Sequence, residues 1–472
     1  MINILIVEDE TDFSDAIEKV ITSFVNDVQI HVAKNRNDAL NFLDQEFYDL
    51  IILDLRIPLV DGEATDVAYG ILVLTQARVN ASGTPIIVVT ESSTEEHLPQ
   101  IISHSEKQDV WGEGQALQMI TFHKKRYLDK FPQLIEPYLT NLQKVHNIEL
   151  VKRTKLSIAE DRLIRIFTRK RGCSKCEVSV LKGGFSGTTV YRLKITDPHG
   201  EGQLNIVCKI GSIESIKLEN NNYENHIQRL HQKATPRKIA ILEHGAKNIC
   251  AIFYSLADGY ESNIFDYVTK NLEPASNLIR SLEELTNPWI SNSEARKTIK
   301  EVRERVLWQA DFEKIRGEVK LEWIEAFEKV EIQTKWSCVH GDMHGLNVLI
   351  SATNTPLLID YGDVGHGAAC LDPITVELSL SFHPEGSFIG NTWPTDEQAI
   401  SWGDLDKYLV GCPFPEFIRE CRLWANRSAA GQREIAAMAY AYVLRQWKYP
   451  NVNKSRVIAL LNGIKIFYDE NT

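Results

Sequence analysis

The sequence predicts two successive domains, a doubly wound parallel α/β domain and then an α+β domain with a helical carboxyl-terminal part. Three short apolar runs in the first 90 residues, separated by helical patterns, are typical of buried parallel strands. From residue 178, apolar residues alternate around glycine-rich and polar turns, which is typical of paired strands. Residues 440–447 and 455–467 have the apolar spacing of helices.

The length of 472 residues is enough for two or three hydrophobic cores. We place the first domain at residues 1–144, a connector at 145–156 and the second domain at 157–472. Within the second domain, a small lobe covers about 157–258 and a large helical lobe about 259–472. The connector contains no Gly/Ser-rich tether, so we expect the two domains to touch.

Polar residues follow each of the three apolar runs in the first domain. The runs span residues 3–7, 49–53 and 85–89. Glu8 and Asp9 follow the first run, Asp54 the second and Thr90 the third. The carboxyl ends of parallel strands meet at one edge of a sheet, so we expect these residues to lie together. Clustered carboxylates are costly unless a cation neutralises them, and the pattern therefore predicts a Mg²⁺ site.

These residues resemble the receiver domain of two-component response regulators, and the resemblance covers about residues 1–140. It implies that Glu8 and Asp9 are the acidic metal pair, that Asp54 is the phosphoacceptor and also a metal ligand, and that Thr90 is the switch hydroxyl. A cognate histidine kinase or phosphotransfer protein is then the expected partner. A homodimer through the receiver face that includes the last helix is also expected as an option. The alternative is a degenerate receiver that serves as a docking scaffold.

The receiver resemblance also requires a lysine at the end of the last strand, to pair with the phosphoryl group. We favour Lys125, because Phe122 then takes the aromatic switch position three residues before it. Lys124 remains the alternative. The proline that usually follows this lysine is Arg126 here, so the cis peptide of that turn is not assured.

The second domain begins with a helical pattern over residues 158–167, followed by a glycine-rich turn between two strands. The glycines allow the turn to close over phosphates, and backbone N–H groups can face an anion. An ordinary β-turn is the alternative. The residues of this turn that we assign to nucleotide binding are Gly183, Gly184, Ser186 and Gly187.

A lysine lies inside the next apolar strand, at residues 204–210. A lysine in such a position usually extends to solvent, but Lys209 can instead bridge nucleotide phosphates. Glu224, fifteen residues further on in a helical pattern, is the expected ion-pair partner of Lys209, and Glu219 is the second choice.

Three polar residues around residue 350 have the spacing of a phosphoryl-transfer site. Asn347 follows Asp342 by five residues, and Asp360 ends an apolar strand thirteen residues later. Asp342 can orient and deprotonate a substrate hydroxyl, while Asn347 and Asp360 can hold Mg²⁺ against nucleotide phosphates.

The His-Gly-Asp form of this loop resembles the aminoglycoside phosphotransferase and choline kinase branch of the kinase-like fold. The resemblance implies a bilobal domain that uses ATP or GTP with Mg²⁺. Lys209 would anchor the phosphates and Glu224 would position it. A later Asp that pins the catalytic loop is matched by Asp372. His340 is expected beneath the loop, and the role of His344 is open.

The predicted function is therefore a response regulator whose output is a phosphotransferase that acts on a hydroxyl acceptor, controlled by phosphorylation of Asp54. A small-molecule acceptor is favoured, because only a modest stretch separates Asp360 from the helical region at Pro373. A protein kinase and a nucleotide-binding, pseudokinase-type interaction platform are the alternatives. The acceptor, the choice between ATP and GTP, the direction of control and the oligomeric state are left open by the sequence.

Composition excludes several other classes. The net charge is −12 and nothing after residue 140 resembles a basic helix-turn-helix module, so we expect no nucleic-acid partner. No apolar run approaches the roughly 20 residues that cross a membrane, so we expect a cytoplasmic protein without a membrane partner. The eight cysteines are scattered, and Cys173 and Cys176 lack the partners of a zinc site, so we expect reduced thiols.

Overall fold

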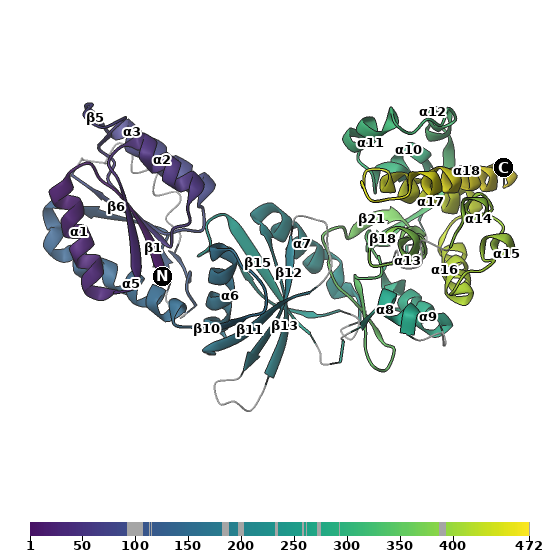
Figure 1. Cartoon of the computed structure of the whole chain (residues 1–472), viewed down its shortest axis with the longest axis horizontal. Helices are drawn as coiled ribbons and strands as arrows, with labels where there is room; N and C mark the ends of the chain where they lie inside the picture. Colours follow the sequence, from purple (N-terminus) through teal and green to yellow (C-terminus); the bar gives the residue numbers. More distant parts are fainter. Residues whose placement is uncertain are drawn as a thin grey trace. The chain divides into compact units, whose positions relative to one another are not determined.

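The computed structural model divides the chain into two compact units. The first comprises Met1–Lys217 with Lys238–Leu256, and the second comprises Leu218–Arg237 with Ala257–Thr472. Each unit is described by itself below (Figure 1). The structure describes residues 1–91, 107–112, 114, 116–181, 188–196, 203–231, 235–256, 259–260, 262–270, 275–291, 293–386 and 393–471.

The chain begins with a five-stranded parallel sheet in the order β2-β1-β3-β6-β9. Its strands are β1 (Ile2–Val7), β2 (Val28–Ala33), β3 (Leu50–Leu53), β6 (Ile86–Thr90) and β9 (Ile120–Lys124). In the register of the sheet, Val7 lies beside Leu53 and Leu53 beside Val88, so these three strands end at one edge. The parallel α/β fold expected for the first domain is confirmed.

Helices cover both faces of this sheet (Figure 1). Apolar residues of α1 (Thr11–Phe24) and α5 (Phe131–His146) pack on one face, and those of α2 (Arg36–Gln45) and α3 (Val67–Asn80) on the other. The strands between them are apolar on both sides, as a doubly covered parallel sheet requires. Short elements complete this domain: β4 (Ile57–Pro58), β5 (Thr65–Asp66), β7 (Lys107–Gln108), β8 (Leu117–Gln118) and the 3₁₀ helix η2 (Lys125–Lys130).

A second, six-stranded sheet follows in the same unit, in the order β10-β11-β12-β13-β15-β14. Its strands are β10 (Glu149–Lys152), β11 (Lys175–Val180), β12 (Thr189–Thr196), β13 (Gln203–Ser212), β15 (Ile249–Ser255) and β14 (Arg237–Leu242). Helix α6 (Ile158–Lys170) begins at a capping box formed by Ser157 and Glu160. The segment predicted as a connector therefore contributes a strand, because β10 pairs in parallel with β11.

The second unit is mainly helical, with two small sheets. The sheets have the orders β16-β19-β20 and β17-β18-β21. Their strands are β16 (Ser262–Asn263), β19 (Val348–Ile350), β20 (Pro356–Leu358), β17 (Glu294–Thr298), β18 (Glu331–Val339) and β21 (Gly365–Ala368). The large lobe, predicted as helical from about residue 259, thus also contains strands. In β18, exposed and buried residues alternate over the first four positions, and the last three residues are all buried.

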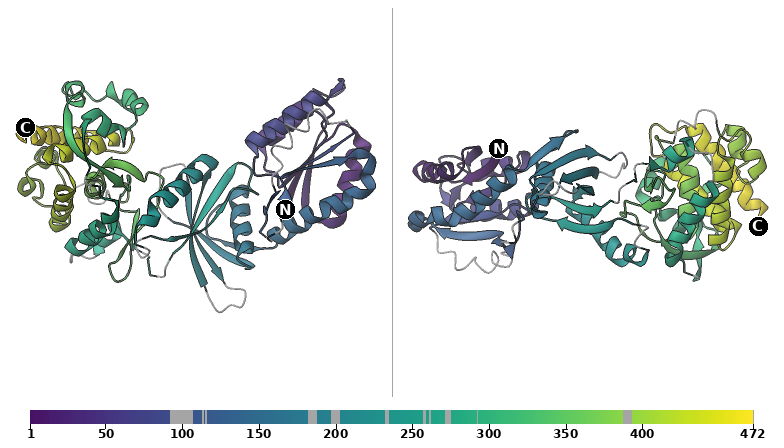
Figure 2. Two further views of the ribbon diagram at one scale, coloured as in Figure 1. Left: turned by 180° about the vertical axis from the view of Figure 1, so that it is seen from behind. Right: turned by 90° about the horizontal axis from the view of Figure 1, so that it is seen from below.

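The carboxyl-terminal helices, yellow in Figure 2, pack against one another. Helix α17 is buried along most of its length and forms the centre of this group. No helix in the described part of the chain is both long and apolar enough to cross a membrane. The helical elements are α7 (Ile213–Asn225), η3 (Ile227–Arg229), α8 (Ile264–Lys270), α9 (Ala275–Thr286), η4 (Asn287–Trp289), α10 (Ile299–Glu304), α11 (Gln309–Arg316), α12 (Ile324–Glu328), α13 (Leu371–Phe382), α14 (Asp396–Ile400), α15 (Leu405–Tyr408), α16 (Pro415–Ser428), α17 (Gln432–Gln446) and α18 (Lys454–Glu470).

Candidate functional site

Three carboxylates meet at the carboxyl edge of the parallel sheet. One oxygen from each of Glu8, Asp9 and Asp54 lies within 4.8 Å of the others. Glu8 and Asp54 are buried, and Asp54 Oδ1 accepts a hydrogen bond of 3.1 Å from the backbone N–H of Arg56. Three converging carboxylate oxygens are the donor set that Mg²⁺ prefers, so these residues fit the metal that the sequence predicted.

Lys125 neutralises part of this acidic cluster. Its Nζ lies 2.7 Å from Asp54 Oδ2 and 2.8 Å from Glu8 Oε1. Lys125 is buried, whereas Lys124 ends β9 with an exposed side chain. Of the two lysines that the sequence offered, the structure brings Lys125 to Asp54.

Burial sets the protonation behaviour of the acidic cluster. It raises the pKa of Glu8 to about 7, although the hydrogen bond from Lys125 opposes this effect. Burial also raises the pKa of Asp9. Burial alone would lower the pKa of Lys125, but its hydrogen bonds and attraction to Asp54 and Glu8 outweigh burial and raise it. A nearby cation would therefore stabilise the ionised forms of Glu8 and Asp9.

The two predicted switch residues lie on neighbouring strands of the same sheet. Thr90 is buried at the end of β6 and pairs in register with Lys124. Phe122 lies opposite Val88 and packs, half-buried, against the apolar cluster beneath α2 and α3.

In the second unit, the loop that carries the His-Gly-Asp motif is pinned by a buried carboxylate. Asp372 accepts hydrogen bonds from the backbone N–H groups of His340, at 2.8 Å, and Gly341, at 3.0 Å. His340 Nε2 donates to the carbonyl oxygen of Ile359 at 3.0 Å. Gly341 has a φ of +85°, and a Cβ there would overlap the backbone of Asp363, so the turn requires glycine. Asp372 and His340 thus lie where the sequence predicted them, around the loop.

Side chains from two directions hold the carboxylate of Asp342. Arg445 Nη1 on α17 donates to Asp342 Oδ1 at 3.2 Å, and His344 Nε2 lies 3.5 Å from Asp342 Oδ2. The side-chain amide of Asn347 donates to the backbone oxygen of Asp342 at 2.8 Å. The Asp342 side chain is 23 % exposed, so the carboxylate can still be approached from solvent.

Asp360 lies next to Asn347 through the backbone. The N–H of Ile359 donates to the carbonyl oxygen of Asn347 at 3.0 Å. Asp360 itself has a φ of +65°, a left-handed conformation that is uncommon for residues other than glycine and that often marks functional sites. The side chain of Asn222 donates to the carbonyl oxygens of Tyr361 and Gly362, at 2.8 and 3.0 Å, and fixes the turn after it.

Burial also shifts the titration of groups around this loop. It lowers the pKa of His344 and lowers that of His383 to about 4, so both imidazoles are neutral at pH 7. Burial and the nearby Asp342 raise the pKa of Asp363. Burial works to lower the pKa of the Arg445 guanidinium, but attraction to Asp342 outweighs it and raises the pKa.

The residues predicted to bind nucleotide are only partly described. Gly183, Gly184, Ser186 and Gly187 lie outside the described residues. Lys209 is buried on β13, in register with Val190 and Ile252.

The sequence offered two carboxylates as the partner of Lys209, with Glu224 preferred over Glu219. In the structure, Glu219 is buried and Glu224 is exposed. Glu219 shares a buried stripe of α7 with Ile216 and Tyr223, whereas Glu224 points to solvent and accepts a hydrogen bond from Gln228. The anchoring role of Lys209 stays a prediction.

Sequence reasoning missed Arg445 and Asn222. Arg445 is 103 residues from Asp342, and Asn222 is 139 residues from Tyr361. One signal for Arg445 was present, since it follows the apolar run of α17, where a charged side chain needs a partner. Asn222 lies in a polar stretch of α7 and carries no such signal.

Two family models match parts of the chain. Residues 4–108 match the response regulator receiver domain, and residues 176–314 match the ternary complex associated domain 9. Neither model describes a kinase. The search of curated proteins found no match.

Solved receiver domains resemble the amino-terminal part of the chain. One is a CheY-like receiver protein from Methanospirillum hungatei JF-1, with 19 % identity, a TM-score of 0.22, and 30 % of this chain and 98 % of that chain covered. Another is the receiver domain of a sensor histidine kinase from Pseudomonas aeruginosa PAO1, with a magnesium ion coordinated in its active-site cleft. It has 18 % identity, a TM-score of 0.21, and coverage of 29 % and 97 %. A third, from a DNA-binding response regulator of Colwellia psychrerythraea 34H, has 20 % identity, a TM-score of 0.21, and coverage of 29 % and 99 %. The chain thus carries a response regulator receiver domain at residues 4–108, followed by a ternary complex associated domain 9 at residues 176–314.

Proposed function

We propose that this chain is a two-component response regulator whose output module transfers a phosphoryl group from ATP or GTP to a hydroxyl acceptor. Phosphorylation of Asp54 would control the transfer. The observation that carries the proposal is the loop around Asp342. It brings an approachable carboxylate, an amide at Asn347 and a strained aspartate at Asp360 into one turn system.

The receiver half of the proposal uses the acidic cluster. A carboxylate oxygen of Asp54 would take the phosphoryl group from a phosphohistidine of a partner kinase, and the P–N bond would break as the P–O bond forms. Mg²⁺ bound by Glu8, Asp9 and Asp54 would neutralise the transferred charge. Lys125, which lies 2.7 Å from Asp54, would pair with the new phosphoryl oxygens.

The output half assigns three roles to the loop residues. Asp342 would accept the proton of the acceptor hydroxyl as that oxygen forms a bond to the γ-phosphorus. The bond from phosphorus to the bridging oxygen would break and leave a nucleoside diphosphate. Asn347 and Asp360 would hold the Mg²⁺ that compensates the phosphate charge.

The stretch after Asp360 favours a small acceptor over a peptide. Gly365–Ala368 forms β21, which pairs with β18, and α13 begins at Leu371. These elements leave little chain for the extended segment with which protein kinases hold a peptide.

A second candidate function is a nucleotide-binding interaction platform without turnover. The ion pair between Arg445 and Asp342 favours it, because the arginine occupies the carboxylate that would have to accept a proton. In an active enzyme, this ion pair has to yield when the acceptor binds.

The test is Mg²⁺-dependent consumption of ATP and GTP by the intact protein. It compares the wild type with Asp342→Asn, with and without beryllofluoride as a phosphoryl mimic on Asp54. The matched control is Asp469→Asn, a change at an exposed aspartate of α18. We expect turnover that is lost in Asp342→Asn and kept in Asp469→Asn, and that depends on the mimic. Nucleotide binding without turnover in every state, over a panel of hydroxyl acceptors, would replace the enzyme with the platform.

A further inference from the structure

Helix α6 lies between the two matched family ranges and is buried almost all round. It occupies residues 158–170, whereas the receiver match ends at residue 108 and the second match begins at 176. From Asp161 to Thr168, every residue except the half-buried Arg165 is buried, so this part of the helix packs on other structure on both sides. Its buried residues are Asp161, Arg162, Leu163, Ile164, Ile166, Phe167 and Thr168.

One side of α6 packs on the six-stranded sheet. The ring of Phe167 stacks on that of Phe253 in β15, with centroids 3.8 Å apart. Tyr191 of β12 donates its hydroxyl to Glu160 at 2.9 Å. These contacts join α6 to the sheet that carries Lys209.

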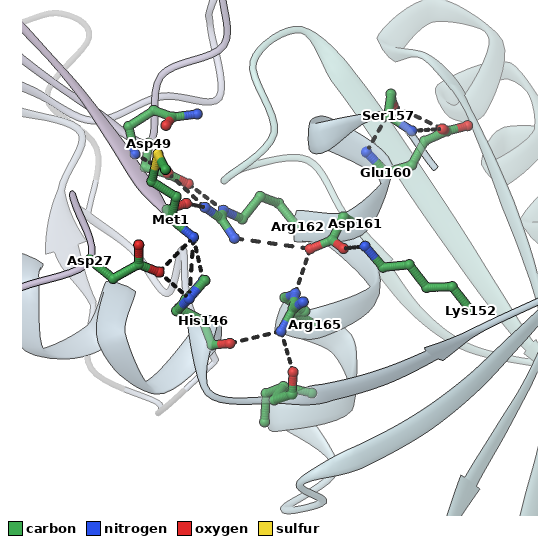
Figure 3. Close-up of polar contacts among 12 residues, drawn as sticks. Met1, Asp27, Asp49, His146, Lys152, Ser157, Glu160, Asp161, Arg162 and Arg165 are labelled. Atoms are coloured by element: carbon green, nitrogen blue, oxygen red, sulfur yellow. Dashed lines mark hydrogen bonds and ion pairs between the residues drawn. The ribbon is translucent and has the colours of Figure 1, made fainter. Parts of the chain in front are cut away.

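On the other side of α6, the guanidinium group of Arg162 contacts the receiver. Arg162 Nε and Nη2 donate to the two carboxylate oxygens of Asp49, at 2.6 and 3.0 Å, and Nη2 also donates to the backbone oxygen of Met1 at 2.7 Å (Figure 3). Arg162 and Asp49 are both buried. Asp49 also accepts a hydrogen bond from the backbone N–H of Asn3 at 2.9 Å. Separating the two surfaces would break these hydrogen bonds and expose the apolar cluster that surrounds them, which makes opening costly.

Arg162 therefore binds the amino ends of the strands whose carboxyl ends form the acidic cluster. Met1 precedes β1, which leads to Glu8 and Asp9, and Asp49 precedes β3, which leads to Asp54. The receiver end that meets α6 and the end that accepts the phosphoryl group are joined by continuous strands.

We call the contacts of α6 and of residues 245–247 with the receiver the joint. A backbone contact extends the joint to the residues just before β6. The N–H of Gly83 donates to the carbonyl oxygen of Lys247 at 2.7 Å, and the N–H of Gly245 donates to that of Gly83 at 2.8 Å. A Cβ on Gly245 would overlap the side chain of Ile166 in α6, so glycine permits this close approach. Lys247 Nζ also donates to the carbonyl oxygens of Asp44 and Glu46, at 3.0 and 3.1 Å.

A third contact joins α6 to the last helix of the receiver. Arg169 donates to the backbone oxygens of Trp111 and Asn141, at 3.1 and 3.0 Å, and to the side-chain oxygen of Asn141 at 2.8 Å. Apolar residues from the receiver, α6 and the six-stranded sheet form one continuous buried cluster around these polar contacts.

We propose that α6 makes the receiver and the six-stranded sheet one cooperative folding unit, so that a change in the stability of the receiver reaches the sheet. The receiver would then act on the output module through a permanent joint and not by release. This coupling does not require that the output module transfers phosphoryl groups, and it holds equally for a binding platform.

The test is native-state hydrogen exchange on the full chain, read at the slowest backbone amides of β3 in the receiver and of β13 in the sheet. In the wild type, both sets should open with the same free energy and the same denaturant dependence. Val73→Ala removes buried apolar contacts of α3, on the receiver face away from α6. We expect this substitution to accelerate both sets by the same factor, roughly tenfold or more.

A variant of the joint should separate the two responses. In Arg162→Met, Val73→Ala should accelerate the β3 amides more than the β13 amides. The control is Arg153→Met, which removes an exposed arginine paired with Glu177 within the same sheet and should leave the two factors equal. Different opening free energies in the wild type, or acceleration by Val73→Ala confined to the receiver, would overturn the proposal. The wild-type comparison needs no variant and decides the question even if a variant fails to fold.

Discussion

At the scale of single residues, the acidic cluster combines burial with incomplete neutralisation. Lys125 supplies one positive charge to a site that contains three carboxylates. Burial raises the pKa of Glu8 and Asp9, and the negative charge of Asp54 adds to this effect. A divalent cation bound there would compensate the remaining negative charge.

Removal of one ligand should weaken the cation site without breaking the fold. Asp9→Asn replaces a half-buried carboxylate by a neutral amide, so we expect the Mg²⁺ affinity to fall by at least roughly tenfold. Isothermal titration calorimetry of the intact protein measures this affinity. Asp12→Asn, at an exposed aspartate in the first turn of α1, is the control and should bind Mg²⁺ as the wild type does. Equal affinity in the Asp9 and Asp12 variants would remove Asp9 from the site.

A second buried carboxyl group makes the stability of the fold depend on pH. Glu434 accepts hydrogen bonds from the backbone N–H groups of Lys335 and Ala430, and burial raises its pKa to about 7. The folded protein therefore binds a proton at Glu434 more tightly than the unfolded chain, whose carboxyl group has a pKa near 4.5. The stability that protonation provides is complete below pH 4.5 and is lost as the pH rises through 7.

Glu434→Gln should remove this pH dependence, because glutamine keeps an acceptor oxygen and does not ionise. Between pH 5 and pH 8, the unfolding free energy of the wild type should fall by about 2 kcal/mol more than that of the variant. Urea unfolding at the two pH values measures the difference. Glu322→Gln, at an exposed position, should show no such difference from the wild type. A parallel loss of stability in the wild type and Glu434→Gln would show that another group titrates.

At the scale of elements, the loop before Asp342 depends on one side chain from a different element. Asp372, in the first turn of α13, satisfies two backbone N–H groups of a turn that contains a left-handed glycine. The loop therefore has a defined conformation without being part of a helix or strand.

Asp372→Ala should destabilise the second unit by about 2–4 kcal/mol, because it leaves two buried N–H groups without an acceptor. Asp372→Asn keeps one acceptor oxygen and should fall between the alanine variant and the wild type. Urea unfolding followed by tryptophan fluorescence gives the order. Asp469→Ala, at the exposed aspartate of α18, is the matched control. Equal stability of the alanine variant and the wild type would mean that the turn stands without Asp372.

At the scale of the whole molecule, all eight cysteines are free and buried. Burial raises the pKa of Cys176, Cys250, Cys338 and Cys412 to about 12, so hardly any thiolate exists at neutral pH. The reduced thiols predicted from the sequence agree with this arrangement.

We expect none of the eight thiols to react quickly with Ellman's reagent in the native protein at pH 8, and all eight to react in denaturant. The native rates should be at least roughly 100-fold below that of free cysteine, because each reaction requires local opening. Free cysteine in the same buffer is the control. A fast phase with the amplitude of one thiol would reveal a surface position that the structure does not contain.

The parallel sheet of the receiver and its polar strand ends could be predicted from the sequence. Each apolar run and the acid that follows it are neighbours in the chain, and parallel pairing alone brings Glu8 and Asp54 to one edge. The spacing from Asp342 to Asn347 is equally local. Helix α5 begins at Phe131, where its apolar spacing and its proline in the first turn are local signals of the same kind.

The residues that interact over long chain distances could not be predicted in this way. Only the tertiary structure brings Lys125, and not Lys124, to Asp54, buries Glu219 in place of Glu224, and joins Arg445 to Asp342. The same holds for Arg162 and Asp49, which are 113 residues apart. Local patterns determine where strands, helices and loops form, because they depend on neighbouring residues. The choice among several charged side chains depends on which one the packed fold buries beside an opposite charge.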